Sequence, residues 1–166
     1  MGIHSVLNLR GNDGLAPWLT EEAACKALGL ELHVVKLYAR RASKQEELLR
    51  LIETFRQIPK PFVMHCKSGA DRAGLASVVY QLVIEKKTLE EARKQLSIRF
   101  LHLESTLTGI VDHLFDVYEE RTRLGPIDFE AWLELEYSRK LISRTFAMKR
   151  DGQDWRSEIK LPLVTP

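Results

Sequence analysis

Short apolar runs alternate with amphipathic stretches along most of the chain. The runs at residues 4–9, 31–37 and 60–66 are bounded by turn residues or proline, which predicts three buried strands. After each run, apolar residues recur every three or four positions, which predicts helices. The predicted helices cover residues 17–29, 43–58, 72–87, 88–96, 107–118 and 127–142. Strands that alternate with helices imply an α/β fold, with a largely parallel central sheet flanked by helices.

Local signals place some of the helix ends and the domain limits. Ser43, with a glutamate three positions on, reads as a capping box, and Thr88 begins the next short helix. The stretch 127–142 is expected to be the last helix. Beyond it the pattern loses its period, so we predict a single domain at residues 1–145 and a C-terminal tail at 146–166.

The composition excludes several classes of protein. Lys and Arg number 25 against 23 Asp and Glu, a net charge of +2, which is too balanced for a general nucleic-acid or membrane surface. The two cysteines, Cys25 and Cys66, make neither a disulfide framework nor a metal cluster. No signal peptide is visible and the longest apolar run is too short to span a bilayer. We therefore expect a cytoplasmic protein with no membrane span and no nucleic-acid partner.

Arginine follows every predicted strand. Arg10 comes after the first strand, Arg40 and Arg41 after the second, and Arg72 after the third. Ligands of parallel α/β sheets bind beyond the carboxyl ends of the strands. Arginines gathered at that edge predict an anionic ligand.

The stretch "HCKSGADRAG" at residues 65–74 carries the most specific chemistry. A strand, a short loop and a helix aim backbone N–H groups at an anion, and Gly69 lets the loop curl tightly. Arg72 can hold two phosphate oxygens with its planar guanidinium. Cys66 at the foot of this loop is expected to ionise readily, and a thiolate below a bound phosphate is a nucleophile for phosphorus. Gly74 is expected to let the helix start lie close to the sheet.

This stretch, with "LNLRG" near the start of the chain, resembles the cysteine-dependent protein tyrosine phosphatase superfamily, and within it the small bacterial dual-specificity branch. The resemblance implies hydrolysis of phosphate monoesters, chiefly of phosphoproteins, through a phosphocysteine on Cys66 with Arg72 on the phosphoryl oxygens. It implies no metal and no organic cofactor. Residues expected to fix the loop or contact phosphate are His65, Lys67, Ser68, Gly69, Ala70, Arg10 and Arg40.

Two positions depart from that family's usual pattern. The segment upstream of the cysteine where many members carry a general-acid aspartate has no acidic residue here. Asp71, directly before the loop arginine, takes the position at which myotubularin-like and Sac-type phosphatases place their acid, so it is the candidate acid. Ala73 stands where the family usually has a serine or threonine hydroxyl, which implies slow breakdown of phosphocysteine.

Three other functions remain open at the level of sequence. A weakly active or non-catalytic phosphate-binding protein would fit Ala73 and the missing upstream acid. A phosphatase acting on phosphoinositides or other small phosphate esters would use the same loop, and Lys67 adds positive charge to it. A rhodanese-like sulfurtransferase also sets a cysteine in such a loop, but the five residues between Cys66 and Arg72 argue against it.

Overall fold

The computed structural model describes residues 2–96 and 107–161, and its centre is a three-stranded parallel sheet. The strands are β1 (Ser5–Asn8), β2 (Glu31–Val34) and β3 (Phe62–His65), in the order β2-β1-β3. Both pairings are parallel, as predicted, although each strand is shorter than its apolar run. The central strand β1 ends at Asn8, which pairs with His65 at the end of β3, so the two carboxyl ends lie side by side.

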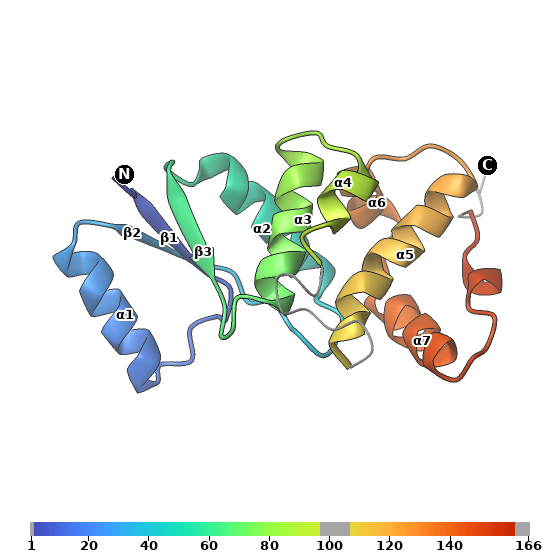
Figure 1. Cartoon of the computed structure of the whole chain (residues 1–166), viewed down its shortest axis with the longest axis horizontal. Coiled ribbons are helices and arrows are strands. Elements are labelled where there is room, and N and C mark those ends of the chain that lie inside the picture. Colours follow the sequence, from blue (N-terminus) through green and yellow to red (C-terminus); the bar gives the residue numbers. More distant parts are fainter. Residues whose placement is uncertain (1, 97–106, 162–166) are drawn as a thin grey trace.

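Helices cover the two faces of the sheet unequally (Figure 1). Helix α1 packs on one side, and all the other helices lie on the other side, with α2 and α3 next to the sheet and α5 and α7 farther out (Figure 1). Their bounds are α1 (Ala16–Ala27), α2 (Gln45–Gln57), α3 (Asp71–Val83), α4 (Leu89–Arg93), α5 (Ile110–Arg123), α6 (Phe129–Leu135) and α7 (Arg139–Arg150). The chain is therefore an α/β fold, as the sequence predicts.

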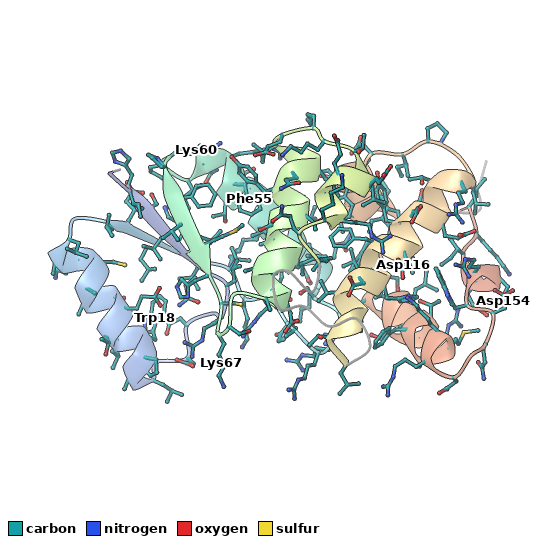
Figure 2. All side chains as sticks on the ribbon, viewed as in Figure 1. Trp18, Phe55, Lys60, Lys67, Asp116 and Asp154 are labelled. Carbon is teal, nitrogen blue, oxygen red and sulfur yellow. The ribbon has the colours of Figure 1, made fainter. Side chains whose placement is uncertain are left out.

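The core between the sheet and α2–α3 holds the strand that leads to the loop. Leu7 of β1 and Phe55 of α2 are fully buried there. The Phe55 ring meets Tyr80 of α3 edge-on at 5.1 Å and Phe62 of β3 at 6.1 Å between centroids (Figure 2). Burial of a large apolar side chain stabilises a fold by about 1.5–3 kcal/mol, so this aromatic cluster fixes β3 and α3 relative to each other.

The helix starts show one correct and one wrong prediction. The short helix expected from Thr88 is α4, and Thr88 caps it: its hydroxyl accepts from the N–H of Glu91 at 3.3 Å, and the Glu91 carboxylate accepts from the N–H of Thr88 at 3.1 Å. The predicted box at Ser43 is wrong by one residue, because the carboxylate of Glu47 accepts from the N–H of Lys44 at 2.8 Å. Ser43 is buried and its carbonyl accepts from the hydroxyl of Tyr137 at 2.6 Å.

The single last helix expected at 127–142 is two helices, α6 and α7, and the prediction was wrong there. The break between α6 and α7 falls at residues 136–138, which contact other parts of the fold. Glu136 pairs with Arg121 of α5, Tyr137 reaches back to the start of α2, and the Ser138 hydroxyl caps α7 by accepting from the N–H of Leu141 at 3.3 Å.

Part of the segment expected to be a tail is packed. Helix α7 continues to Arg150, and the side chains of Trp155 and Ile159 join the apolar core. Residues 162–166 lie outside the described residues. The limit between domain and tail at residue 145 stays a prediction.

Asp116 of α5 is the charged residue that links three helices on the far side of the fold (Figure 2). Its carboxylate accepts from Lys149 of α7 at 2.8 Å and pairs with Arg93 of α4. Burial by itself would raise the pKa of Asp116, but the His113 ring and the two cations outweigh burial and hold the pKa well below its usual range.

We predict that Asp116→Asn lowers the free energy of unfolding by about 2 kcal/mol at pH 7, since Lys149 and Arg93, both partly buried, lose the charge of this carboxylate and Arg93 keeps Glu119. A depressed pKa contributes stability above the pKa of the unfolded carboxyl, near 3.9, and that contribution is lost as the pH falls further. The gap between wild type and variant in urea unfolding should therefore shrink below about pH 4. A gap that stays constant down to pH 3 would contradict this account, and Asp151→Asn, at the exposed end of α7, is the control.

Candidate active site

The loop between β3 and α3 spans residues 66–70 and leads directly from the sheet into a helix N-terminus. Gly69 has a φ of +77°, in the left-handed region where a side chain is strained, so glycine permits the tight curl. The role expected of Gly74 needs a correction. Its missing side chain lets α3 approach not the sheet but the chain after α4, because a Cβ there would lie 2.8 Å from Leu96 Cδ2 and 3.3 Å from the carbonyl of Gln95.

Cys66 lies at the foot of this loop and is only 8% exposed. Burial by itself would raise the pKa of its thiol. Hydrogen bonds from backbone N–H groups, followed by the positive charge of Arg72, outweigh burial, so the pKa is lowered from that of an ordinary thiol. The N–H groups belong to Ala73, Ser68 and Gly69. A thiolate is therefore stabilised at this position.

Arg72 is the second residue of α3, and its side chain lines a pocket. Within the described part of the chain, its buried Nε has no hydrogen-bond partner. The pocket has a volume of about 310 Å³ and is lined by Leu37, Tyr38, Ala39, Arg40, Arg41 and Arg72. The guanidinium of Arg41 stacks over the Tyr38 ring at 3.9 Å. The arginines after the second and third strands thus share one cavity, which suits an anion.

The other predicted residues occupy different positions around the loop. Lys67 and Ser68 are exposed, and Lys67 lies at the tip of the loop (Figure 2). Ala70 is buried and precedes the first residue of α3, the partly buried Asp71. Arg10 follows the end of β1, but its side chain is not among those that line the pocket with Arg72.

His65 is held by a residue that the sequence did not reveal. Its Nδ1 lies 3.1 Å from the carbonyl oxygen of Cys66, and its Nε2 lies 2.5 Å from Oε1 of Glu21 on α1. The other oxygen of Glu21 accepts from the side-chain amide of Asn8 at 2.6 Å. Glu21 and His65 are 44 positions apart, one on helix α1 and the other at the end of strand β3, so no local pattern connects them.

Two further searches of the described residues concern metals and membranes. No three His, Cys, Asp or Glu side chains within residues 2–96 and 107–161 gather as a metal site. Over the same residues, every helix is too short or too polar to cross a bilayer.

Comparison with known proteins gives one match. The sequence model described as the tyrosine phosphatase family matches residues 6–89, which include β1 from its second residue, β2, β3, helices α1 to α3 and the loop with Cys66 and Arg72. A search of curated proteins found no match to the chain.

The two cysteines offer a direct test of the loop's electrostatics. Burial, and then the nearby Glu21 carboxylate, raise the pKa of Cys25, whereas the pKa of Cys66 is lowered. We predict that iodoacetamide at pH 6.5 alkylates Cys66 at least about tenfold faster than Cys25, because the thiolate is the reacting species. Peptide mass spectrometry measures both rates in one sample.

Inorganic phosphate should protect Cys66 and leave the rate at Cys25 unchanged. Arg72→Gln should slow alkylation of Cys66 and weaken this protection, because the variant removes a positive charge beside the thiolate. Equal rates at the two cysteines, with no effect of phosphate, would show that the loop does not activate Cys66.

Proposed function

Because the chain belongs to the tyrosine phosphatase family, we propose that it hydrolyses phosphate monoesters on proteins, with tyrosine or dual specificity, through a phosphocysteine on Cys66. The observation that carries this proposal is the lowered pKa of a buried thiol at the foot of a helix, six positions before an arginine. A buried cysteine without such surroundings has a raised pKa, as Cys25 has. A phosphoprotein in the cytoplasm is the substrate that we propose.

Phosphate binding would use the donors that surround Cys66, some of which also stabilise the thiolate. The backbone N–H groups of the loop, residues 67–70, and the N-terminus of α3 supply donors and a partial positive charge. An unpaired buried donor such as Arg72 Nε is costly, and a bound phosphate would supply its acceptor. Arg40, and Arg10 beyond the pocket, are proposed to contact the substrate around the phosphate.

The reaction would proceed in two displacements. The Cys66 thiolate attacks phosphorus and forms an S–P bond, while the P–O bond to the leaving group breaks. Asp71, as the acid, gives its proton to the departing oxygen. Water then attacks the phosphocysteine, the Asp71 carboxylate takes a proton from that water, and the S–P bond breaks to release phosphate and the thiolate.

Ala73 bears on the second displacement. It has no hydroxyl to donate to the sulfur as the S–P bond breaks, and only its backbone N–H contributes to the stability of the thiolate. The second step should therefore be slower than the first, and phosphocysteine should accumulate during turnover. A non-catalytic phosphate-binding protein would form no such intermediate.

We predict that, after wild-type protein has reacted with an aryl phosphate and been quenched in acid, its Cys66 peptide carries an added phosphoryl group. Cys66→Ser should lose this adduct and at least about 100-fold in kcat/KM, since a serine hydroxyl is far less ionised than this thiol. Cys25→Ser is the matched control and should retain both. Activity of Cys66→Ser within about tenfold of wild type would remove Cys66 from the nucleophile role.

We predict a different signature for Asp71→Asn. General-acid help is worth roughly 10²–10⁴-fold where the departing oxygen needs a proton and little where it does not. The variant should therefore lose activity on a tyrosyl or alkyl phosphate and retain most of it on an ester with an acidic leaving group. Asparagine keeps the shape of aspartate, and the cap position of α3 is Ala70 and not Asp71, so the fold should be unaffected. Equal losses on both substrates would make Asp71 a structural carboxylate.

A further inference from the structure

The ring of His65 lies between a carbonyl oxygen and a carboxylate, and both only accept hydrogen bonds while Glu21 is ionised. Nδ1 faces the carbonyl oxygen of Cys66 at 3.1 Å, and Nε2 faces the carboxylate of Glu21 at 2.5 Å. A neutral imidazole has one N–H and can satisfy only one of these oxygens, whereas the imidazolium has two. Both contacts are made together only if His65 is doubly protonated and paired with the negative charge of Glu21.

Glu21 is itself held in place from the central strand. Its Oε2 accepts from the side-chain amide of Asn8 at 2.6 Å, and the amide oxygen of Asn8 accepts from the N–H of Arg10 at 2.7 Å. Asn8 is only 2% exposed and pairs with His65 across the sheet. Since both carboxylate oxygens of Glu21 have partners, its orientation toward His65 is fixed.

We propose that Glu21 is a positioning residue for the nucleophile: it keeps His65 doubly protonated, and His65 in turn holds the carbonyl of Cys66 at the start of the loop. This inference rests on the proposed role of Cys66 in phosphate-ester hydrolysis. Glu21 does not touch the thiol or the substrate. It acts through the peptide that follows Cys66, whose orientation determines where the next N–H groups point.

This contact also joins helix α1 to the reacting sulfur. Without the carboxylate, His65 would keep the N–H that faces the Cys66 carbonyl but lose its second proton and its charge. The hydrogen bond to the Cys66 carbonyl would then come from a neutral ring and be weaker, so the N–H groups of Ser68 and Gly69 would be held less firmly and would stabilise the thiolate less well. Other titratable or charged groups around this contact and the loop are Cys25 of α1, whose pKa Glu21 raises, Lys67 in the loop, Asp71 and Arg72 at the start of α3, Arg10 after β1, and Arg40 and Arg41 after β2.

The first test reads the protonation of His65 directly. In ¹⁵N spectra of the imidazole rings at pH 7.5, both nitrogens of wild-type His65 should show imidazolium shifts, and the signals are assigned by their loss in His65→Asn. In Glu21→Gln, one nitrogen should become unprotonated, because the glutamine amide can donate to it. Glu22→Gln is the control, since Glu22 is the next residue of α1 and its side chain is exposed.

The second test reads the consequence at the thiol. The midpoint of the pH profile for Cys66 alkylation should rise by about one pH unit in Glu21→Gln and stay unchanged in Glu22→Gln. The kcat of Glu21→Gln should fall more than its KM changes, because the nucleophile and not the substrate contacts is affected. A merely structural role of Glu21 would lower the midpoint of urea unfolding without moving the alkylation profile of the folded protein.

The outcomes separate this inference from the proposed function. A neutral His65 ring in the wild-type protein, a measurement that needs no variant to fold, would overturn the role of Glu21. An alkylation midpoint in Glu21→Gln equal to that of wild type would overturn it as well. If wild type forms no phosphocysteine yet Glu21→Gln shifts both the ring and the thiol signals, the proposed function fails while the role of Glu21 in positioning Cys66 is supported.

Discussion

A negative charge on a buried sulfur needs donors around it, and the part of the fold that holds the site is arranged to supply them. Burial alone makes a thiolate unfavourable, so Cys66 depends on the N–H groups of its loop and on Arg72. The loop can present those groups only because Gly69 adopts a positive φ and α3 begins at Asp71. The same donors suit the oxygens of a phosphate, so one arrangement suits both the thiolate and the substrate that we propose for it.

The sheet and the helices that flank it determine where that loop lies. Strand β3 ends beside the central strand β1, and the Phe55 cluster keeps α3 against the sheet. Gly74 lets the first turn of α3 come close to Leu96 and Gln95. From the opposite layer, Glu21 of α1 reaches the end of β3 through His65 (Figure 1). The site is thus held from both sides of the sheet, and α3 supplies Arg72, whose positive charge helps to lower the pKa of the thiol.

Sequence reasoning succeeded where a feature depends on neighbours a few positions away. The alternation of strands and helices, the Thr88 cap and the strand–loop–helix around Cys66 are all local, and each has a recognisable pattern. It failed where a local structure depends on contacts with distant segments of the chain. The box lies one residue beyond Ser43, whose hydroxyl accepts from the N–H of Tyr38 and whose carbonyl accepts from Tyr137, far along the chain. Glu21 reads as an ordinary polar residue of an amphipathic helix, and only the folded chain brings it to His65.

The central claim is that Cys66 and Arg72 form one site for a phosphoryl group, with the sulfur as the attacking atom. A crystal structure with orthovanadate tests it most directly, since vanadate takes the geometry of phosphorus under attack and bonds to a nucleophile that is aligned for it. The account predicts a bond from Cys66 Sγ to vanadium, with the oxygens accepting from the loop N–H groups and from the guanidinium of Arg72. Vanadate held only at Arg40 and Arg41, with no bond to the sulfur, would contradict it.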